Sequence, residues 1–529
     1  MNDIPRKAVP ATLAAFLIMG SMAVLKHESL HASIADLGLA VAHLRDLELR
    51  AWWPVVFWGH CQPLKPIWAW FYGLMPDGAG AAALLVTQAA LLCMPAAELA
   101  RRHGWTALAA FILYFPLWFN GLFDFHPDHL AVPLLFGFLF AAEDRRFATA
   151  CAMAMLLALV KEPFALQTAA CGAYLLVKEG RGALPAALLL IVFGCGYFLA
   201  ATGWLIPALG PASGGPLGSG AFGWMGSTPS EALLFMVTHP FATLGAMVDT
   251  PGKLLYLGTL FGALLFIPLL APAELLPALP PLALALLSQE PNHYGIGHHY
   301  TAGVIAPLVM GFMHGLPRAR KLLGTTRAGR HTAAIVLAAL LLGHVALSPS
   351  PISRLFWTDK IWSYGWRAYV PTERDVMIRT ALRRHLDGAQ VLSMQNTLMW
   401  DGALGERTLL VFPAGVAQPL RWPDFDALSR RDPIAALAGR DTHPPDLFLS
   451  ADCVVLDLKR PWHVGDRGCA WLRGRCTDDR AAMEFMDMVD VARRDFATVF
   501  ENDGFLILRR DPAQAHPARP AGRTGGATS

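Results

Sequence analysis

The chain has 529 residues, of which 54% are hydrophobic and only 16% are charged. This composition excludes an ordinary soluble protein and is typical of a protein with many membrane spans. The formal net charge of +3, without a basic block interleaved with aromatic residues, argues against nucleic acid as a partner.

Apolar stretches close to the length needed to cross a bilayer core recur from the N-terminus to about Ser348. We therefore predict a mainly α-helical, polytopic membrane domain over residues 1–350, with about eleven transmembrane helices. The predicted spans are 8–25, 79–100, 105–121, 129–142, 147–161, 164–178, 183–208, 254–271, 273–288, 299–315 and 332–348.

The basic residues between these spans favour one side of the membrane. If the N-terminus is cytoplasmic, thirteen lysines and arginines lie on its side and only six on the other side. Loops rich in lysine and arginine stay in the cytoplasm. The pattern predicts a cytoplasmic N-terminus and, after an odd number of spans, an external C-terminal region. The thirteen are Arg6, Lys7, Arg101, Arg102, Arg145, Arg146, Lys178, Arg181, Arg318, Arg320, Lys321, Arg327 and Arg330, and the six are Lys26, Arg45, Arg50, Lys65, Lys161 and Lys253.

The first external loop, residues 26–78, is predicted to begin with an amphipathic helix. Such a helix would lie in the outer membrane interface. Asp36 lies within it among small and apolar neighbours. Partial desolvation would raise the pKa of this carboxylate and strengthen it as a base, whereas full solvation would make it an ordinary helix charge. The apolar positions, three or four residues apart, are Leu30, Ile34, Leu37, Val41 and Leu44.

Further along the same loop, WGHCQPLKPIWAW (residues 58–70) contains His60 and Lys65 in an aromatic segment broken by prolines. One interpretation is an interfacial tryptophan belt with a lysine that reaches toward the lipid headgroups. The other is that His60 and Lys65 contribute to a substrate site.

The densest group of reactive side chains is FDFHPDH (residues 123–129). Pro127 prevents a regular helix, so these residues should form a shaped turn before the next span. Helix capping by Asp128 would not explain two histidines and a second aspartate. The group could bind a divalent cation or hold a phosphate and a sugar, through Asp124, His126, Asp128 and His129.

Two more groups lie at predicted span ends on the same side. Lys161 and Glu162 are either a self-neutralising interfacial pair or functional residues. SQEPNHYGIGHHY (residues 288–300) adds further candidates. Its adjacent histidines would point about 100° apart on a helix, which favours contact with a ligand or phosphate over zinc binding. The candidates are Glu290, His298, His299 and Tyr300.

From about Pro351 onward the charge density rises and short β-type runs appear. We predict a soluble, external α/β domain over residues 351–511, large enough to bury its own core. Residues 512–529 are rich in Pro, Ala, Gly and Arg and are predicted to be a disordered tail. The predicted strands lie at 389–394, 407–412, 452–458 and 504–510, and the predicted helices at 373–386 and 481–494.

These motifs resemble the bacterial predicted membrane proteins of domain-of-unknown-function family 2079. Pro163 departs from the family pattern, in which an acidic residue is expected. The likeness rests on ADLG (35–38), GHCQPLKP (59–66), FDFHPDHLAVPLL (123–135), KEP (161–163), HY (299–300), VLSMQNTL (391–398), ADCVVLDL (451–458) and GFLILRR (504–510).

The family is grouped with the GT-C glycosyltransferases, polytopic enzymes that use polyprenyl-phosphate sugars. The resemblance therefore implies a GT-C-like fold in the bacterial inner membrane. It also implies that Asp36 corresponds to the acidic residue that those enzymes carry in their first external loop.

Residues and resemblance together predict an integral membrane glycosyltransferase. It would move a hexosyl or pentosyl group from a lipid-linked donor to a glycan, lipid or protein acceptor on the external face. Asp36 would act as the base, and Lys161, His126, His299 and Lys65 would hold the donor phosphate. A single displacement would invert the anomeric centre.

Neither a P-loop nor a GxGxxG motif is present, so no nucleotide cofactor is expected, while a divalent cation stays open as a cofactor. The alternatives are a transporter or lipid flippase, and a non-catalytic envelope assembly protein. Transporters usually place ionisable residues near the bilayer midplane, whereas here they gather at span ends on one side.

Overall fold

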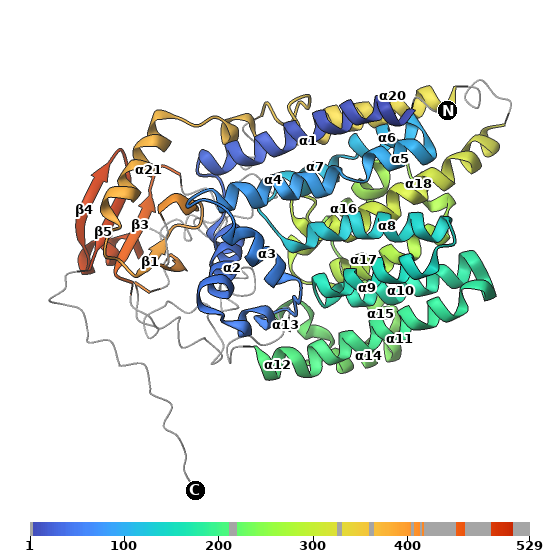
Figure 1. The fold of residues 1–529 in the computed structure, drawn as a ribbon, viewed down its shortest axis with the longest axis horizontal. Helices are drawn as coiled ribbons and strands as arrows, with labels where there is room; N and C mark the ends of the chain where they lie inside the picture. The colour runs from blue at the N-terminus through green and yellow to red at the C-terminus, as the bar shows by residue number, and fades with distance from the viewer. Residues whose placement is uncertain are drawn as a thin grey trace, which may run out of the picture.

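The computed structural model describes residues 4–210, 219–324, 331–358, 364–403, 407–412, 415–416, 451–460 and 488–510. In these ranges a bundle of helices carries a five-stranded sheet beyond one end, and residues 26–78, the first loop, which was predicted to be external, lie between the two (Figure 1). The predicted class, a mainly α-helical chain with a small C-terminal α/β part, is confirmed.

The helices of the bundle account for most of the predicted spans. In chain order they are α1 (Ile4–Glu28), α4 (Gly80–Cys93), α5 (Ala96–His103), α6 (Trp105–Ile112), α7 (Phe115–Leu122), α8 (Ala131–Glu143), α9 (Phe147–Val160), α10 (Pro163–Glu179), α11 (Leu184–Ala200), α16 (Pro251–Gly262), α17 (Leu279–Leu287), α18 (Ala302–Leu323) and α20 (Thr332–Leu347).

By length and apolar composition, three stretches among the described residues qualify as membrane spans, and the pair α6 and α7, bent by 49°, makes a fourth candidate. The shorter apolar helices Phe147–Val160, Pro272–Leu287 and Thr332–Leu347 coincide with further predicted spans. The total of about eleven stays a prediction. The three stretches are Ala8–Glu28, Gly80–His103 and Pro163–Leu209.

The longest of these stretches passes along the bundle twice, because α10 and α11 pack side by side as an antiparallel hairpin. A Cβ atom at Gly172 would lie 2.6 Å from Ala187 O, and one at Gly194 would lie 2.4 Å from Ala165 O. Glycine at both positions therefore lets the two backbones touch, as small residues do between membrane helices.

The predicted span 254–271 is wrong as one continuous helix. After α16 ends, Leu265 and Phe266 both have φ of +57°, and the chain continues as short 3-10 segments, η7 (Ile267–Leu270) and η8 (Pro272–Ala278), before α17. Prolines within these segments cannot donate helical hydrogen bonds. The irregular backbone packs closely on α18, where a Cβ at Gly315 would lie 2.3 Å from Ile267 O.

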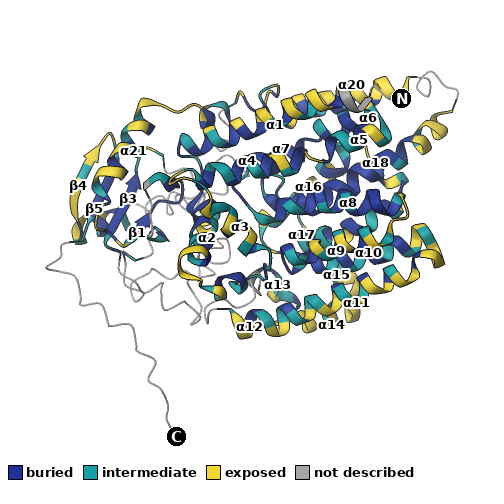
Figure 2. Cartoon of the chain, viewed as in Figure 1, coloured by how far each residue is buried: buried dark blue, intermediate teal, exposed yellow. Residues whose placement is uncertain are grey.

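Residues 229–246, which fell in a predicted external loop, contain two short helices, α14 (Pro229–Thr238) and α15 (Pro240–Ala246). They follow the one-turn helices α12 (Ile206–Leu209) and α13 (Ser219–Phe222). Figure 2 shows exposed surface along α11 and α14, whereas α8 is mostly buried. The exposed side chains of α14 and α15 include Leu233, Leu234, Val237 and Phe241, which suits a surface that faces lipid.

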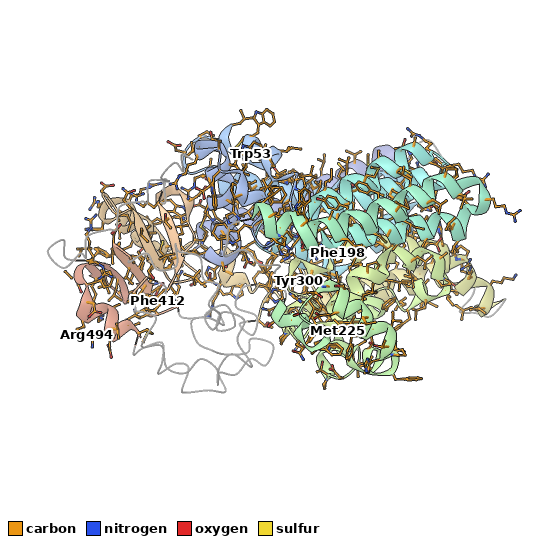
Figure 3. The ribbon with its side chains drawn as sticks, turned by 90° about the horizontal axis from the view of Figure 1, so that it is seen from below. Trp53, Phe198, Met225, Tyr300, Phe412 and Arg494 are labelled. Carbon is orange, nitrogen blue, oxygen red and sulfur yellow. The ribbon has the colours of Figure 1, made fainter. Side chains whose placement is uncertain are left out.

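The first loop contains a five-residue π-helix, η1 (Ile34–Gly38), followed by α2 (Leu39–Arg50), a 3-10 turn, η2 (Trp53–Phe57), and α3 (Lys65–Gly73). The apolar stripe predicted to face lipid is buried instead in a cluster shared with the C-terminal region, including Ile378, Met399 and Ile507. Exposed apolar side chains remain elsewhere in the loop, among them Trp53, which projects from the surface in Figure 3.

The C-terminal sheet has the strand order β2-β1-β3-β5-β4. β1 pairs in parallel with β2 and β3, and β5 is antiparallel to β3 and β4. Helix α21 (Glu373–His385) precedes the sheet and was predicted. All four predicted strands are confirmed, while β4 was missed. The strands are β1 (Val391–Met394), β2 (Thr408–Val411), β3 (Cys453–Asp457), β4 (Ala497–Asn502) and β5 (Phe505–Arg509).

The C-terminal region buries its own core only in part. Val454, Leu456 and Phe496 belong to a cluster formed within this region, but Val455 and Ile507 join the cluster of the first loop. The loop and the sheet therefore fold against each other. Of the predicted helix 481–494, residues 488–494 are described and helical, and the predicted tail 512–529 lies outside the described residues.

Candidate functional site

Asp36 lies in the π-helical turn η1, a type of turn that is rare and often found at functional sites. The backbone N–H of Asp36 donates to Ser33 Oγ, 3.2 Å away. Asn396, which follows β1, holds the turn from the other side: its side-chain oxygen accepts from Ala35 N at 2.8 Å and from the Ser33 hydroxyl at 3.2 Å. Its carbonyl accepts from Ile34 N at 2.7 Å.

Asp124 joins the FDFHPDH turn to the same π-helical turn. One carboxylate oxygen accepts from Lys26 Nζ at 3.2 Å, and the other accepts from Ser33 N at 2.6 Å. Lys26 also donates to Leu122 O at 3.0 Å, so the end of α1 is fixed to the end of α7. Both oxygens of Asp124 therefore have protein partners, which gives Asp124 a positioning contact.

His126 and His299 stack face to face, with ring centroids 3.7 Å apart and planes 14° apart. His126 Nε2 lies 3.7 Å from Asp36 Oδ1. The backbone N–H of His126 donates to Gln88 Oε1, at 3.2 Å, and Gln88 is fully buried in α4. This places a histidine from the predicted turn between the carboxylate of Asp36 and His299, which begins the 3-10 segment η10 (His299–Thr301) just before α18.

Asp128 is the buried centre of the cluster. Its Oδ2 lies 3.6 Å from Lys161 Nζ and 3.4 Å from His299 Nε2. Burial raises the pKa of Asp128, but Lys161 and the surrounding histidines outweigh this effect, so that the pKa lies below its usual range. Its other oxygen, Oδ1, makes no hydrogen bond within the described part of the chain.

His60 and Glu162 form a second pair beside Lys161. Glu162 Oε1 lies 2.7 Å from His60 Nδ1, and Oε2 accepts from Cys61 N at 2.9 Å. Burial lowers the pKa of His60, whereas burial raises the pKa of Glu162 but is outweighed by His60 and Lys161. Both directions fit an ionised Glu162 that accepts Nδ1–H from a neutral imidazole, which leaves His60 Nε2 as an acceptor.

The remaining predicted site residues lie around this cluster. The Tyr300 ring centroid is 4.1 Å from that of His299, and the His298 ring lies 5.5 Å from Phe123. In Figure 3, Tyr300 lies at the junction of the helical bundle with the first loop and the C-terminal sheet. His129 Nδ1 is 2.9 Å from His126 O within its own turn. Glu290 immediately precedes the 3-10 segment η9 (Pro291–Tyr294), and its N–H donates to Ser288 Oγ.

Lys65 lies apart from the cluster. Its amine donates to Val55 O at 2.9 Å and is 3.4 Å from His43 Nδ1, and it pairs with no carboxylate among the described residues. Burial, with a smaller effect of Lys161, lowers the pKa of Lys65 to about 7. A lysine held in this way has no direct contact with the other predicted phosphate ligands.

Asp36 differs from the other carboxylates of the cluster in its access to solvent. Its side chain is 28% exposed, compared with 5% for Asp124 and 7% for both Asp128 and Glu162. Burial in its surroundings raises the pKa of Asp36, and His126 partly opposes this shift. An accessible carboxylate with a raised pKa is suited to accept a proton from a bound molecule.

Sequence reasoning missed the residues that hold the cluster in place, namely Lys26, Ser33, Gln88 and Asn396. Lys26 had been counted only as a loop charge, although a lysine ending a long apolar helix needs a partner. His27 and Asp401 form a similar link, 3.3 Å apart, between the end of α1 and the C-terminal region. No spacing signal joins residues this far apart in the sequence.

The fold and the cluster define a helical, membrane-type protein with buried titratable side chains at one end of its bundle. The family model described as predicted membrane protein of domain-of-unknown-function family 2079 matches residues 56–392, and the chain belongs to this family. No curated protein matches the chain.

Among solved structures, the chain is similar to the crystal structure of ArnT from Cupriavidus metallidurans bound to undecaprenyl phosphate. The sequence identity is 13% and the TM-score is 0.45, over 96% of this chain and 99% of that chain.

Proposed function

We propose that this protein is an inverting membrane glycosyltransferase of GT-C type that takes a sugar from a polyprenyl-phosphate donor at the external membrane face. The observation that carries the proposal is the arrangement around Asp36: an accessible carboxylate, 3.7 Å from His126, beside the buried groups Asp128, Lys161 and His299. These residues come from separate segments and meet at one end of the bundle.

In this mechanism, Asp36 accepts the proton of an acceptor hydroxyl. The hydroxyl oxygen forms a bond to the anomeric carbon of the donor sugar from one face, while the bond to the phosphate oxygen breaks on the opposite face. The polyprenyl phosphate leaves with the electron pair, and the anomeric centre is inverted. Because a phosphate is a weak base, its departure needs no strong general acid.

Lys161 and the neighbouring histidines are proposed to hold the donor phosphate. Charge-assisted hydrogen bonds from a lysine ammonium to phosphate are short and strong, and a neutral imidazole can add a donor through its one N–H. Asp128 fixes the Lys161 ammonium within the cluster at 3.6 Å, and Glu162 orients His60. Asp128 thus acts on a phosphate ligand rather than on the sugar, whereas His60 presents an acceptor nitrogen and is not itself a phosphate ligand.

The position of the cluster favours transfer over transport. A transporter is expected to have ionisable groups near the bilayer midplane. Here α8 and α18 both begin next to the cluster, and the stretches 131–142 and 302–313 contain no charged residue.

The test is a comparison of lipid-linked sugars and envelope glycans, by mass spectrometry, in a wild-type and a deletion strain. The proposal predicts accumulation of one polyprenyl-phosphate sugar and loss of the glycan, lipid or protein modification that contains the same sugar. Wild-type protein should restore both, whereas Asp36→Asn should restore neither. Unchanged lipid-linked sugars and glycans in the deletion strain would contradict the proposal.

A further inference from the structure

A second group of titratable side chains lies at the opposite end of the bundle. His103 is the last residue of α5, Glu143 is the last residue of α8, and His314 lies in the second half of α18. α8 and α18 both start beside the candidate functional site, so the second group is about 20 Å away from it along these helices. The basic loops predict that this end faces the cytoplasm.

The three side chains direct one donor atom each toward a common point. Glu143 Oε1 is 3.0 Å from His314 Nε2 and 3.5 Å from His103 Nε2, and all three atoms lie within 4.8 Å of one another. Ligand atoms about 2.0–2.1 Å from a tetrahedral zinc ion are about 3.3–3.4 Å apart. The separations from Glu143 are therefore close to those of a metal site.

The partners around these atoms also suit metal ligands. His314 Nδ1 contacts Glu274, and Lys178 Nζ lies 2.5 Å from the same Glu274 oxygen. A metal-bound histidine usually donates its second ring N–H to a carboxylate in this way. Arg102 approaches the other oxygen of Glu143, Oε2, at 3.6 Å, which leaves Oε1 to the histidines.

His103 provides an independent sign of an unfilled contact. Its Nε2 is buried and makes no hydrogen bond within the described part of the chain, although it points toward Glu143. A buried polar atom without a hydrogen bond costs free energy unless something binds it. A cation between His103, Glu143 and His314 would provide the missing contact.

We propose that His103, Glu143 and His314 bind one divalent transition metal ion of the zinc class. Two histidines and a carboxylate are a common ligand set for zinc, and they leave a fourth coordination position open. The ion would link α5, α8 and α18 at this end of the bundle. It is separate from the proposed glycosyl transfer at the other end.

The experiment uses the full chain in detergent, purified with a tag that contains no histidine and stripped with a chelator. Cobalt(II) is titrated as a visible-light probe, and zinc is then added. The proposal predicts one equivalent of cobalt with d–d absorption bands of a four- or five-coordinate site, and displacement by one equivalent of zinc. Absence of saturable binding to monodisperse wild-type protein would overturn it.

Variants locate the site. His103→Gln and Glu143→Gln should each weaken cobalt affinity by tenfold or more, and His103→Gln should fold because it weakens only a long contact, 3.5 Å, between His103 Nε2 and Glu143 Oε1. His331→Gln, at an exposed histidine preceding α20, is the matched control and should leave the affinity unchanged. Unchanged binding by monodisperse His103→Gln, or loss of binding in His126→Gln at the other site, would overturn the assignment.

Discussion

The ion pair between Asp128 and Lys161 should be strongly coupled energetically, because both side chains are at most 10% exposed and lie 3.6 Å apart. Asp128→Asn keeps the shape of the side chain but leaves the Lys161 ammonium without its carboxylate. Removing one partner of a buried ion pair typically costs about 3–5 kcal/mol. We expect a destabilisation in this range for Asp128→Asn, since His299 also loses its contact with Asp128.

The double variant Asp128→Asn with Lys161→Met removes both charges and should recover most of this loss. Replacement of a whole buried pair by neutral groups is often nearly neutral, and coupling between contacting residues is typically up to about 3 kcal/mol. The free energy of unfolding would be measured for the wild type, both single variants and the double variant by denaturation with sodium dodecyl sulfate in mixed micelles.

Asp46 and Arg50 provide a matched control, because their charged atoms are also 3.6 Å apart but their side chains are 27% and 56% exposed. The corresponding double-mutant cycle, with Asp46→Asn, Arg50→Met and the double variant, should give a coupling free energy of only about 0.3–0.5 kcal/mol. The reasoning about the buried cluster fails if the coupling between Asp128 and Lys161 is no larger than that of the control.

Three further predictions follow from the geometry. Asn396→Ala removes two hydrogen bonds from the turn of Asp36 and should lower the transfer rate by about 10–100-fold. An unchanged rate would show that the turn keeps its conformation without Asn396. The pKa of Lys65 is lowered from 10.5 to about 7 in the folded protein. Between pH 7 and pH 10.5, Lys65 is therefore protonated in the unfolded chain and neutral in the folded one, so the free energy of unfolding rises with pH in this range. Lys65→Met should therefore stabilise the protein most at or below pH 7 and progressively less toward pH 10, and a gain independent of pH would contradict the buried position. Reporter fusions after Arg330 and after Arg374, on either side of α20, should report opposite compartments, and a common compartment would break the predicted topology.

Much of the fold could be predicted because membrane helices and buried strands are continuous apolar runs. β1, β3 and β5 were found in this way, since their side chains are almost all buried. β4 was missed because it is mostly exposed at the sheet edge and has no apolar run. The break after α16 depends on positive φ at Leu265 and Phe266. Leucine and phenylalanine rarely adopt positive φ, so their presence in the sequence does not predict a turn.

The composition of the candidate site was partly readable for a similar reason. Charged and histidine side chains at the ends of apolar spans stand out from their surroundings, so Asp128, Lys161 and His299 could be named in advance. The residues that hold the site in place could not be named from the sequence. Asn396 is far from Asp36, and Lys26 is far from Asp124, along the chain, and they meet only through tertiary packing. The apolar stripe of the first loop was correctly identified, but an apolar stripe does not specify whether lipid or protein covers it.

The transfer rate of Asp36→Asn tests the central claim most directly. Membranes from the deletion strain, each supplied with one variant, would be incubated with the lipid-linked sugar that accumulates in that strain. The account predicts a loss of about 10²–10⁴-fold for Asp36→Asn with normal protein levels, no effect of Asp46→Asn, and a wild-type rate that falls at low pH as Asp36 takes up a proton. A wild-type rate for Asp36→Asn, at normal protein levels, would contradict it, because another group would then have to act as the base.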